Sequence, residues 1–347
     1  MIIDTPSGSA IGVNNNGTII VGTVGVRRAY SVYWTDGSPP IVRNMGFLKD
    51  GKHTVVFAVS DDGGHAVGSA DTTGGVERAF RWKKHSIPEM EDLGVPTGYV
   101  NSEARDVNNV GDIIVGNSSR TPGDFHAFRW HESNGLKIEK LIEPPEATTC
   151  LANGTNDDGT VIVGFCRLRS GYDHAICWLG GTTTEVTELE CLGSLSSAYA
   201  YAISGDGNVI VGNSTSGNPN IGYAVRWKRN PGTKKFNIEN LNVLPDPPQD
   251  SWIANAFGVN YDGSVIVGQC LSSSGQTSEA FIWREDATPK VQKLEDADKE
   301  RKASAAFGVT KKSDGTIIAV GRSTFLGGGQ IAVRWNNLSI DDLHFPS

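Results

Sequence analysis

Tryptophan recurs along the whole chain at a nearly constant interval, and this regularity limits the folds that the chain can adopt. Seven tryptophans are separated by 48, 48, 48, 49, 56 and 52 residues: Trp34, Trp82, Trp130, Trp178, Trp227, Trp283 and Trp335. Upstream of each tryptophan lies a Val-Gly pair, and these pairs end at Gly22, Gly68, Gly116, Gly164, Gly212, Gly268 and Gly321. Two independent markers that share one period identify a sevenfold internal repeat.

Each repeat has the pattern of four short strands. In the third repeat, strands are expected over 104–107 and 112–115, on either side of a turn that ends at Gly111, and again over 127–130 and 136–142. Glycine at the end of the turn supplies the positive φ that a tight hairpin with a bulge needs. The glycine of each Val-Gly pair is expected to let the adjacent sheet approach closely.

Four-stranded units of this length, repeated seven times, predict an all-β fold, a seven-bladed β-propeller with four antiparallel strands per blade. We expect one domain over residues 1–347. The expected blades cover approximately 9–56, 57–104, 105–152, 153–200, 201–256, 257–306 and 307–347. An open solenoid is the alternative, but it needs polar caps on its terminal repeats, and both terminal repeats keep the apolar markers.

Arginine precedes the repeated tryptophan at Arg81, Arg129, Arg226 and Arg334. A position that recurs in register is better explained as a structural stem, packed along the sheet with its head paired to an acid, than as a ring of ligand-binding groups.

Composition excludes several classes of partner. The formal net charge of −8 and the pI near 5.4 provide no general attraction for nucleic acid or for an anionic membrane. No apolar run approaches the roughly 18 residues that span a bilayer, so membrane insertion is not expected. The histidines lack zinc-motif spacing, and hairpin chemistry explains the turn aspartates without calcium, so we expect neither a metal nor a cofactor. Met1–Asp4 lacks the basic and apolar regions of a secretory signal.

The trio His126-Ala127-Phe128 before Arg129-Trp130, with the run from Val107 to Gly116, resembles the HAF repeat family of bacterial extracellular repeat proteins. The resemblance covers the whole chain. It implies an extracellular or bacterial cell-surface location, as in the passenger regions of autotransporters, and it implies no defined activity.

Recognition is expected on the face that carries the long, variable loops between the second and third strands and between blades, because variable loops on a rigid scaffold usually bind ligands. Trp252 stands outside the tryptophan register and could stack on a sugar or anchor a protein. The alternative is a loop aromatic that folds back over the blade edge. The candidate ligand-binding residues are Trp252, Asp250, Tyr99, Phe125, Tyr172, Arg167, Arg169 and Phe325.

We therefore expect a noncatalytic binding or adhesion module, a monomeric domain that recognises a protein or a glycan. The first alternative is a propeller glycoside hydrolase with paired carboxylates drawn from Asp71, Asp124, Asp173 and Asp250. The second alternative is an intracellular interaction scaffold, which reduced cysteines would favour.

One pair of the five cysteines could form a disulfide. If Asn156 pairs with Thr160 across a three-residue loop, Cys150 lies directly opposite Cys166 on adjacent strands. In the same register Cys270 faces Ala254, which offers no partner.

Overall fold

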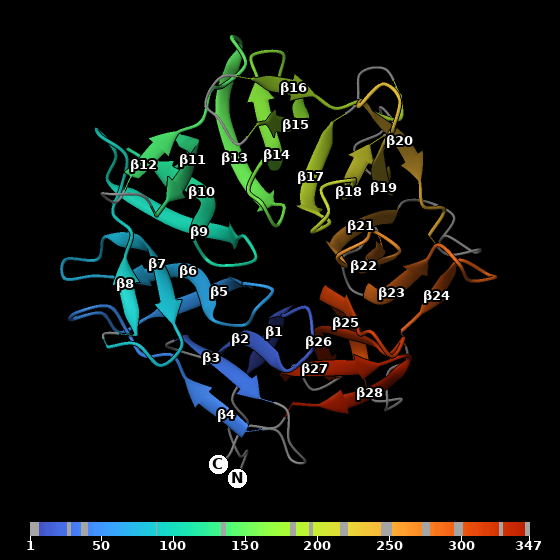
Figure 1. Ribbon diagram of the computed structural model, residues 1–347, viewed down its shortest axis with the longest axis horizontal. Coiled ribbons are helices and arrows are strands. Elements are labelled where there is room, and N and C mark those ends of the chain that lie inside the picture. Colours follow the sequence, from blue (N-terminus) through green and yellow to red (C-terminus); the bar gives the residue numbers. More distant parts are fainter. Residues whose placement is uncertain are drawn as a thin grey trace.

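The chain is all-β in a computed structural model, in which strands surround a central axis (Figure 1). The structure describes residues 7–25, 29–35, 41–87, 89–132, 137–180, 185–193, 197–215, 221–243, 252–272, 278–294, 301–325 and 329–343. Every regular element within these ranges is a strand. None of the described residues forms a helix that could cross a membrane.

The strands fall into consecutive groups of four, and we call each group a blade, numbered in chain order. Blades 1 to 3 contain β1 (Gly8–Val13), β2 (Ile19–Val24), β3 (Tyr30–Thr35), β4 (Ile41–Asn44); β5 (Thr54–Val59), β6 (His65–Asp71), β7 (Glu77–Lys83), β8 (Met90–Asp92); β9 (Asn101–Val107), β10 (Ile113–Ser119), β11 (Phe125–His131), β12 (Lys137–Lys140). Blades 4 and 5 contain β13 (Ala147–Thr155), β14 (Val161–Leu168), β15 (Asp173–Leu179), β16 (Val186–Glu188); β17 (Ala198–Ile203), β18 (Val209–Thr215), β19 (Ile221–Arg229), β20 (Phe236–Asn240). Blades 6 and 7 contain β21 (Trp252–Val259), β22 (Val265–Ser272), β23 (Ser278–Arg284), β24 (Val291–Lys293); β25 (Arg301–Lys311), β26 (Ile317–Phe325), β27 (Gln330–Asn336), β28 (Ser339–Asp342).

Within each blade the strands are antiparallel and pair in chain order, with the first strand innermost (Figure 1). Short parallel pairs also link β19 to β21 and β23 to β25, so blades 5 to 7 form one continuous sheet. Strand β1 lies against β25, β26 and β27, which places blade 1 beside blade 7. The predicted blades of four antiparallel strands are confirmed.

The turn between the first and second strands has the predicted glycine chemistry in every blade. The final glycines have φ between +67° and +87°: Gly17, Gly63, Gly111, Gly159, Gly207, Gly263 and Gly315. The polar residue three positions earlier in most turns holds the hairpin; for example, Asn108 Oδ1 accepts the N–H of Ile113 at 2.9 Å. These turns are therefore rigid, and all seven point toward one end of the central axis.

The glycine of each Val-Gly pair has a different role from the one that we expected. A Cβ on Gly116 would lie 2.0 Å from the carbonyl oxygen of Glu103, on the first strand of the same blade, and the other six glycines meet equivalent carbonyl oxygens at 1.9–2.2 Å. The close approach is therefore to the partner strand and not to the adjacent sheet. It occurs where the first strand contains a β-bulge; in blade 3 the register shifts between Ala104 and Asp106.

Apolar side chains fill the spaces between neighbouring blades. Seven core clusters are present among the described residues, and each combines side chains of two consecutive blades. The repeated tryptophans lie in these clusters and are at most 3% exposed. One cluster joins Trp34 of blade 1 to Val320 and Ala332 of blade 7.

The arginines that precede the tryptophans extend this packing. Arg81 lies 4.4 Å from the ring centroid of Trp130 in the next blade, and Arg226 lies 4.5 Å from that of Trp283. Both guanidinium groups also pair with glutamates. These contacts bear out the structural interpretation for Arg81 and Arg226.

Cys150 and Cys166 form a disulfide between β13 and β14, with an S–S distance of 2.00 Å. The expected loop is one residue too short, because Asn156 pairs with Val161 and not with Thr160. A bulge between Ala152 and Gly154 shifts the register back by one residue, so Cys150 still faces Cys166. Cys177 and Cys270 are buried thiols, and Cys270 faces Ala254 as expected.

Loss of one interblade tryptophan should unfold the chain far more readily than loss of Trp252. We expect Trp130→Ala to lower the free energy of unfolding by about 3–5 kcal/mol, because it removes a fully buried ring from a shared core. Trp252→Ala, at a half-buried ring outside the register, is the matched control, with an expected cost of less than half as much. Urea denaturation followed by circular dichroism measures both. Equal losses of unfolding free energy in the two variants would show that the repeated tryptophans contribute no more to stability than Trp252.

Candidate functional site

The bulges of the seven first strands aim one residue per blade toward the central axis. Each bulged residue lines a cavity at the end of the channel where the tight turns lie, and we call this cavity the channel mouth. The bulged residues form a ring: Ile11, Phe57, Arg105, Asn153, Tyr201, Phe257 and Phe307. The ring is chemically uneven, because its apolar members run from blade 5 through blade 7 to blade 2, whereas blades 3 and 4 supply Arg105 and Asn153.

The ring residues of blades 5, 6 and 7 form an aromatic wall on the apolar side of the channel mouth. The ring centroids of Tyr201 and Phe257 are 5.5 Å apart, and those of Phe257 and Phe307 are 5.6 Å apart. Two cations of the chain already lie against rings of the channel mouth: the guanidinium of Arg105 is 4.4 Å from the centroid of Phe57, and that of Arg322 is 5.4 Å from the centroid of Phe307. Aromatic faces attract cations through the negative charge of their π systems.

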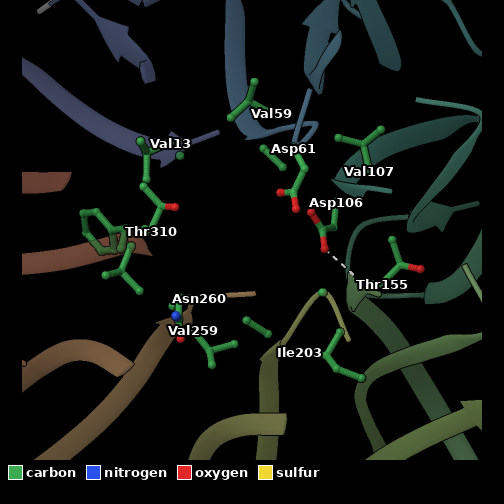
Figure 2. A pocket seen from close by; sticks show the side chains of 18 of the residues that line it. Val13, Val59, Asp61, Asp106, Val107, Thr155, Ile203, Val259, Asn260 and Thr310 are labelled. Atoms are coloured by element: carbon green, nitrogen blue, oxygen red, sulfur yellow. Dashed lines mark hydrogen bonds between the residues drawn. The ribbon is translucent and has the colours of Figure 1, made fainter. Parts of the chain in front are cut away.

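The opposite side of the channel mouth carries three carboxyl groups. Figure 2 shows the carboxyl groups of Asp61 and Asp106 pointing into the cavity, on neighbouring blades. Asp157, at the same turn position as Asp61, also lines it. Asp106 follows the bulge at a position where the other blades have a small residue: Gly12, Ala58, Gly154, Ala202, Gly258 and Gly308. Its carboxylate accepts the N–H of Thr155 at 2.9 Å and so bridges to the next blade.

All three carboxyl groups bind protons more tightly than ordinary aspartates. Burial, the charges of Asp157 and Asp62, and a hydrogen bond with Asp157 raise the pKa of Asp61 to about 7. Burial also raises the pKa of Asp106 to about 7, although backbone N–H groups of Thr155 and Val107 oppose the shift. The pKa of Asp157 is raised by burial and by the charges of Asp158 and Asp206. At neutral pH Asp61 and Asp106 are thus partly protonated, and a bound cation would displace these protons.

The channel mouth is small. Its volume is about 210 Å³, which suits one inserted side chain or a small molecule, whereas drug-sized ligands generally occupy about 300–1,000 Å³. A shallower hollow of about 730 Å³ adjoins it on the outer side and shares Asn15, Asp61, Asn260 and Tyr261 with it. The longer turn of blade 7, with Lys311 and Lys312, forms the far wall of this hollow. No group of three or more histidine, cysteine, aspartate or glutamate side chains in the described ranges is arranged to hold a metal ion.

The sequence-predicted binding residues that the structure describes lie outside the channel mouth. Trp252 begins β21, half-buried, with its ring edge-on to Tyr223 at 5.7 Å. Trp252 thus packs on the blade from the start of a strand, and its role in binding stays a prediction. Phe325 ends β26, half-buried. Asp250 lies outside the described residues.

Two of the predicted residues lie in blade 3 or just before it, near an ion-pair cluster. The ring of Tyr99 is edge-on to His126 at 5.4 Å and lies 5.3 Å from the guanidinium of Arg120. His126 contacts Asp124 at 3.0 Å and Glu143 at 2.7 Å. Phe125 begins β11 and lines a separate small hollow. His126, the histidine of the His-Ala-Phe trio, thus connects the segments that carry Asp124 and Glu143.

The remaining three predicted residues belong to blade 4. Arg167 makes two hydrogen bonds to Asp173, at 2.9 and 2.7 Å, and Asp173 also accepts the hydroxyl of Tyr199. Arg169 is exposed beside Glu146, and Tyr172 is 36% exposed. Two of the paired-carboxylate candidates, Asp124 and Asp173, therefore form local ion pairs, and neither lines the channel mouth.

Sequence reasoning missed the three acids of the channel mouth because aspartate is common in these turns for structural reasons. At the third turn position, Asp62, Asp158, Asp206 and Asp262 accept a backbone N–H two residues on. Asp61 and Asp157 stand one position earlier, where other blades have Asn15 or Asn109. Two features of the sequence could have identified these acids: aspartate at the second turn position, and Asp106 at a position where the other blades have a small residue.

Comparisons with known proteins agree on the fold alone. No family model matches the chain, and no curated protein matches it. The β-propeller domain of the trilobed protease from Pyrococcus furiosus is similar in structure, with a TM-score of 0.61 at 9% identity over 98% of both chains. A puromycin-hydrolysing peptidase from Mycobacterium tuberculosis gives 0.64 at 11% identity over 98% of this chain and 52% of that one. TolB from Acinetobacter baumannii gives 0.50 at 14% identity over 81% of this chain, which spans only 61% of that protein.

These findings correct one prediction. The assignment to the HAF repeat family is wrong, because no family model matches and the similar structures are TolB and peptidase propellers. The motif on which it rested is explained by blade geometry: Ala127 and Phe128 are buried strand residues, and the Val-Gly pair accommodates a bulge.

The pKa of Asp61 has a measurable consequence for stability. The folded pKa of about 7 exceeds the unfolded value of about 3.9, so the unfolded state loses this proton first as the pH rises. Folding is therefore penalised progressively between about pH 4 and pH 7. We expect Asp61→Asn to gain stability relative to the wild type between pH 5 and pH 8, in urea unfolding at each pH. Asp262→Asn is the control, because the pKa of Asp262 is lowered and lies below this pH window. Its free energy of unfolding should differ from that of the wild type by the same amount at every pH between 5 and 8. Parallel curves for Asp61→Asn and the wild type would contradict the assigned pKa.

Proposed function

We propose that the chain is a closed seven-bladed β-propeller, one domain over residues 1–347 with the blade boundaries expected from the sequence, and that it works as a noncatalytic binding module. The core cluster shared by blades 1 and 7 supports closure. The disulfide between Cys150 and Cys166 supports a location outside the cytoplasm, because disulfides persist in oxidising compartments. It also weighs against an intracellular scaffold.

The uneven wall of the channel mouth carries the proposal. A sevenfold scaffold needs no difference between its blades, so a cavity with aromatic rings on one side and carboxyl groups on the other requires a separate explanation. Our sequence-based expectation placed recognition on the long-loop face. The cavity moves the proposed site to the opposite face, where the tight turns lie.

The aromatic rings and carboxyl groups of the channel mouth suit a cationic ligand group. The volume of the cavity suits a primary ammonium. An ammonium group offers three donors to the carboxyl oxygens of Asp61, Asp106 and Asp157, while its alkyl stem packs on the rings of Phe257 and Phe307. A lysine side chain of a partner protein and a free alkylamine present the same chemistry. The protein is the source that we propose, because the adjoining hollow extends the contact surface beyond the channel mouth.

A glycoside hydrolase is the second candidate, since a carboxyl group with a pKa of about 7 can act as a general acid. Two features oppose it. Asp106 already accepts a backbone N–H that joins two blades, and the volume of about 210 Å³ leaves little space for a sugar chain. Release of reducing ends from an oligosaccharide panel, abolished by both Asp61→Asn and Asp106→Asn, would favour the hydrolase over the binding module.

Binding of a primary ammonium should strengthen as the pH rises through 7, because ionisation of the carboxyl groups creates the charges that hold it. We expect n-butylammonium and a blocked tripeptide with a central lysine to perturb amide resonances of the tight turns in NMR titrations. Affinity at pH 8 should exceed that at pH 6 several-fold. The double variant Asp61→Asn with Asp157→Asn should weaken this pH dependence and leave only the part that comes from Asp106.

The neutral compound n-butanol and a tripeptide with norleucine in place of lysine are the matched controls. If only the lysine peptide binds, the partner is a protein; if n-butylammonium binds equally well, a free amine suffices. Equal binding of the neutral compounds, or affinity that falls between pH 6 and pH 8, would exclude the cation site.

A further inference from the structure

A groove lies on the outer rim between blades 5 and 6, away from the channel mouth. It lies between the outer strands β20 and β24 and has a volume of about 380 Å³. Its walls include the apolar side chains of Leu241 and Val291, and the nearly buried ring of Trp283 lies at its base. This volume falls within the range of small-molecule sites.

Arg226 lines the groove and has an unused donor. Its Nε and Nη2 pair with Glu239 at 2.7 Å, and its Nη2 also lies 3.4 Å from Glu285. Its Nη1 has no hydrogen-bond partner among the described residues, although Arg226 is only 5% exposed. A buried donor on a charged group is costly to leave unpaired, so the charge of this guanidinium is incompletely compensated and favours an anion beside it.

The equivalent position between blades 2 and 3 shows how the same contact looks when it is complete. Arg81 packs on Trp130 as Arg226 packs on Trp283. There Nη1 donates to the carbonyl of Gly111 at 2.8 Å and to Glu132 at 2.8 Å. At the blade 2–3 interface the protein itself therefore satisfies this nitrogen, whereas at the blade 5–6 interface it does not.

The cationic groups around Trp283 favour an anion at this place. Lys290, an exposed residue, holds its Nζ 5.5 Å from the centroid of Trp283, on the ring that Arg226 also contacts. Among the charged residues that line the groove, Arg226 and Lys290 outnumber the one glutamate, Glu239. An arginine and a lysine beside an apolar floor are suited to a carboxylate that carries an apolar body.

We propose that the groove between blades 5 and 6 binds a carboxylate with an apolar body, whose oxygens accept from Lys290 and lie beside the guanidinium of Arg226 while its body packs on Trp283 and Leu241. This inference is independent of the cation site, since the two sites share no residue. A free carboxylic acid and the C-terminal carboxylate of a peptide present the same group.

The test is an NMR titration of the full chain with 3-phenylpropanoate, followed at the indole N–H of Trp283. We expect a saturable shift of this resonance, and 3-phenylpropanamide, which lacks the charge, should cause none. A tetrapeptide that ends in phenylalanine, with a free or an amidated C-terminus, distinguishes the two sources: saturable binding of the free form alone, tighter than that of 3-phenylpropanoate, identifies a peptide terminus.

Lys290→Gln, at an exposed position, should weaken binding about tenfold without unfolding the chain. Lys228→Gln is the matched control, because it removes a charge from the same ion-pair group without touching the groove, and it should leave the affinity within about twofold. Equal binding of the acid and the amide, no shift at Trp283, or equal losses in the two lysine variants would each overturn the proposal.

Discussion

Packing between neighbouring blades is the constraint on which the rest of the structure depends. A blade of four short strands cannot bury its own faces, so each obtains a core only from the blade beside it. The seven clusters are shared in this way, and each is built on a tryptophan that is almost fully buried. Because the last cluster joins blade 7 to blade 1, no described blade is left with an open apolar face. The arginine that stacks on the next tryptophan and pairs with glutamates strengthens the same interface at the rim.

The same interface determines how residues reach the channel. Each first strand bulges by one residue. At the bulge, a backbone carbonyl of the first strand lies so close to the second strand that only glycine fits there, as Gly116 does against Glu103. The Val-Gly marker is thus the sequence signature of the bulge. The bulged residue is freed from pairing and lines the channel, so the scaffold provides seven positions, one per blade, that can vary without changing a core. At these positions the chain places aromatic rings on one side and Arg105 and Asn153 on the other.

The features that could be predicted are those that the chain repeats. Seven tryptophans and seven turn glycines gave the strand order, the turn geometry and the cross-strand position of Cys150 and Cys166. That last prediction held because two unforeseen features cancelled: the turn after Asn156 is one residue longer than assumed, and the bulge at Asn153 restores the register. The channel mouth was not predicted, because each of its acids occurs at a position that the repeat fills differently elsewhere. A single aspartate in place of a small residue gives no periodic signal, and its meaning appears only when seven strands converge.

The electrostatic cost of these acids is the strongest reason to assign them a use. A carboxyl group whose pKa is raised by burial makes folding less favourable at neutral pH. Asparagine would avoid that cost at the turn position of Asp61 and Asp157, and it stands there in blades 1 and 3 as Asn15 and Asn109. The turn itself therefore does not require the charge. The acids with raised pKa values also lie together on one side of the channel mouth, opposite the aromatic wall. Asp62 and Asp158, one residue later in the turns, lie outside the channel mouth and accept backbone N–H groups. A charge that the scaffold can do without, and that destabilises the empty protein, is accounted for when a cation completes the site.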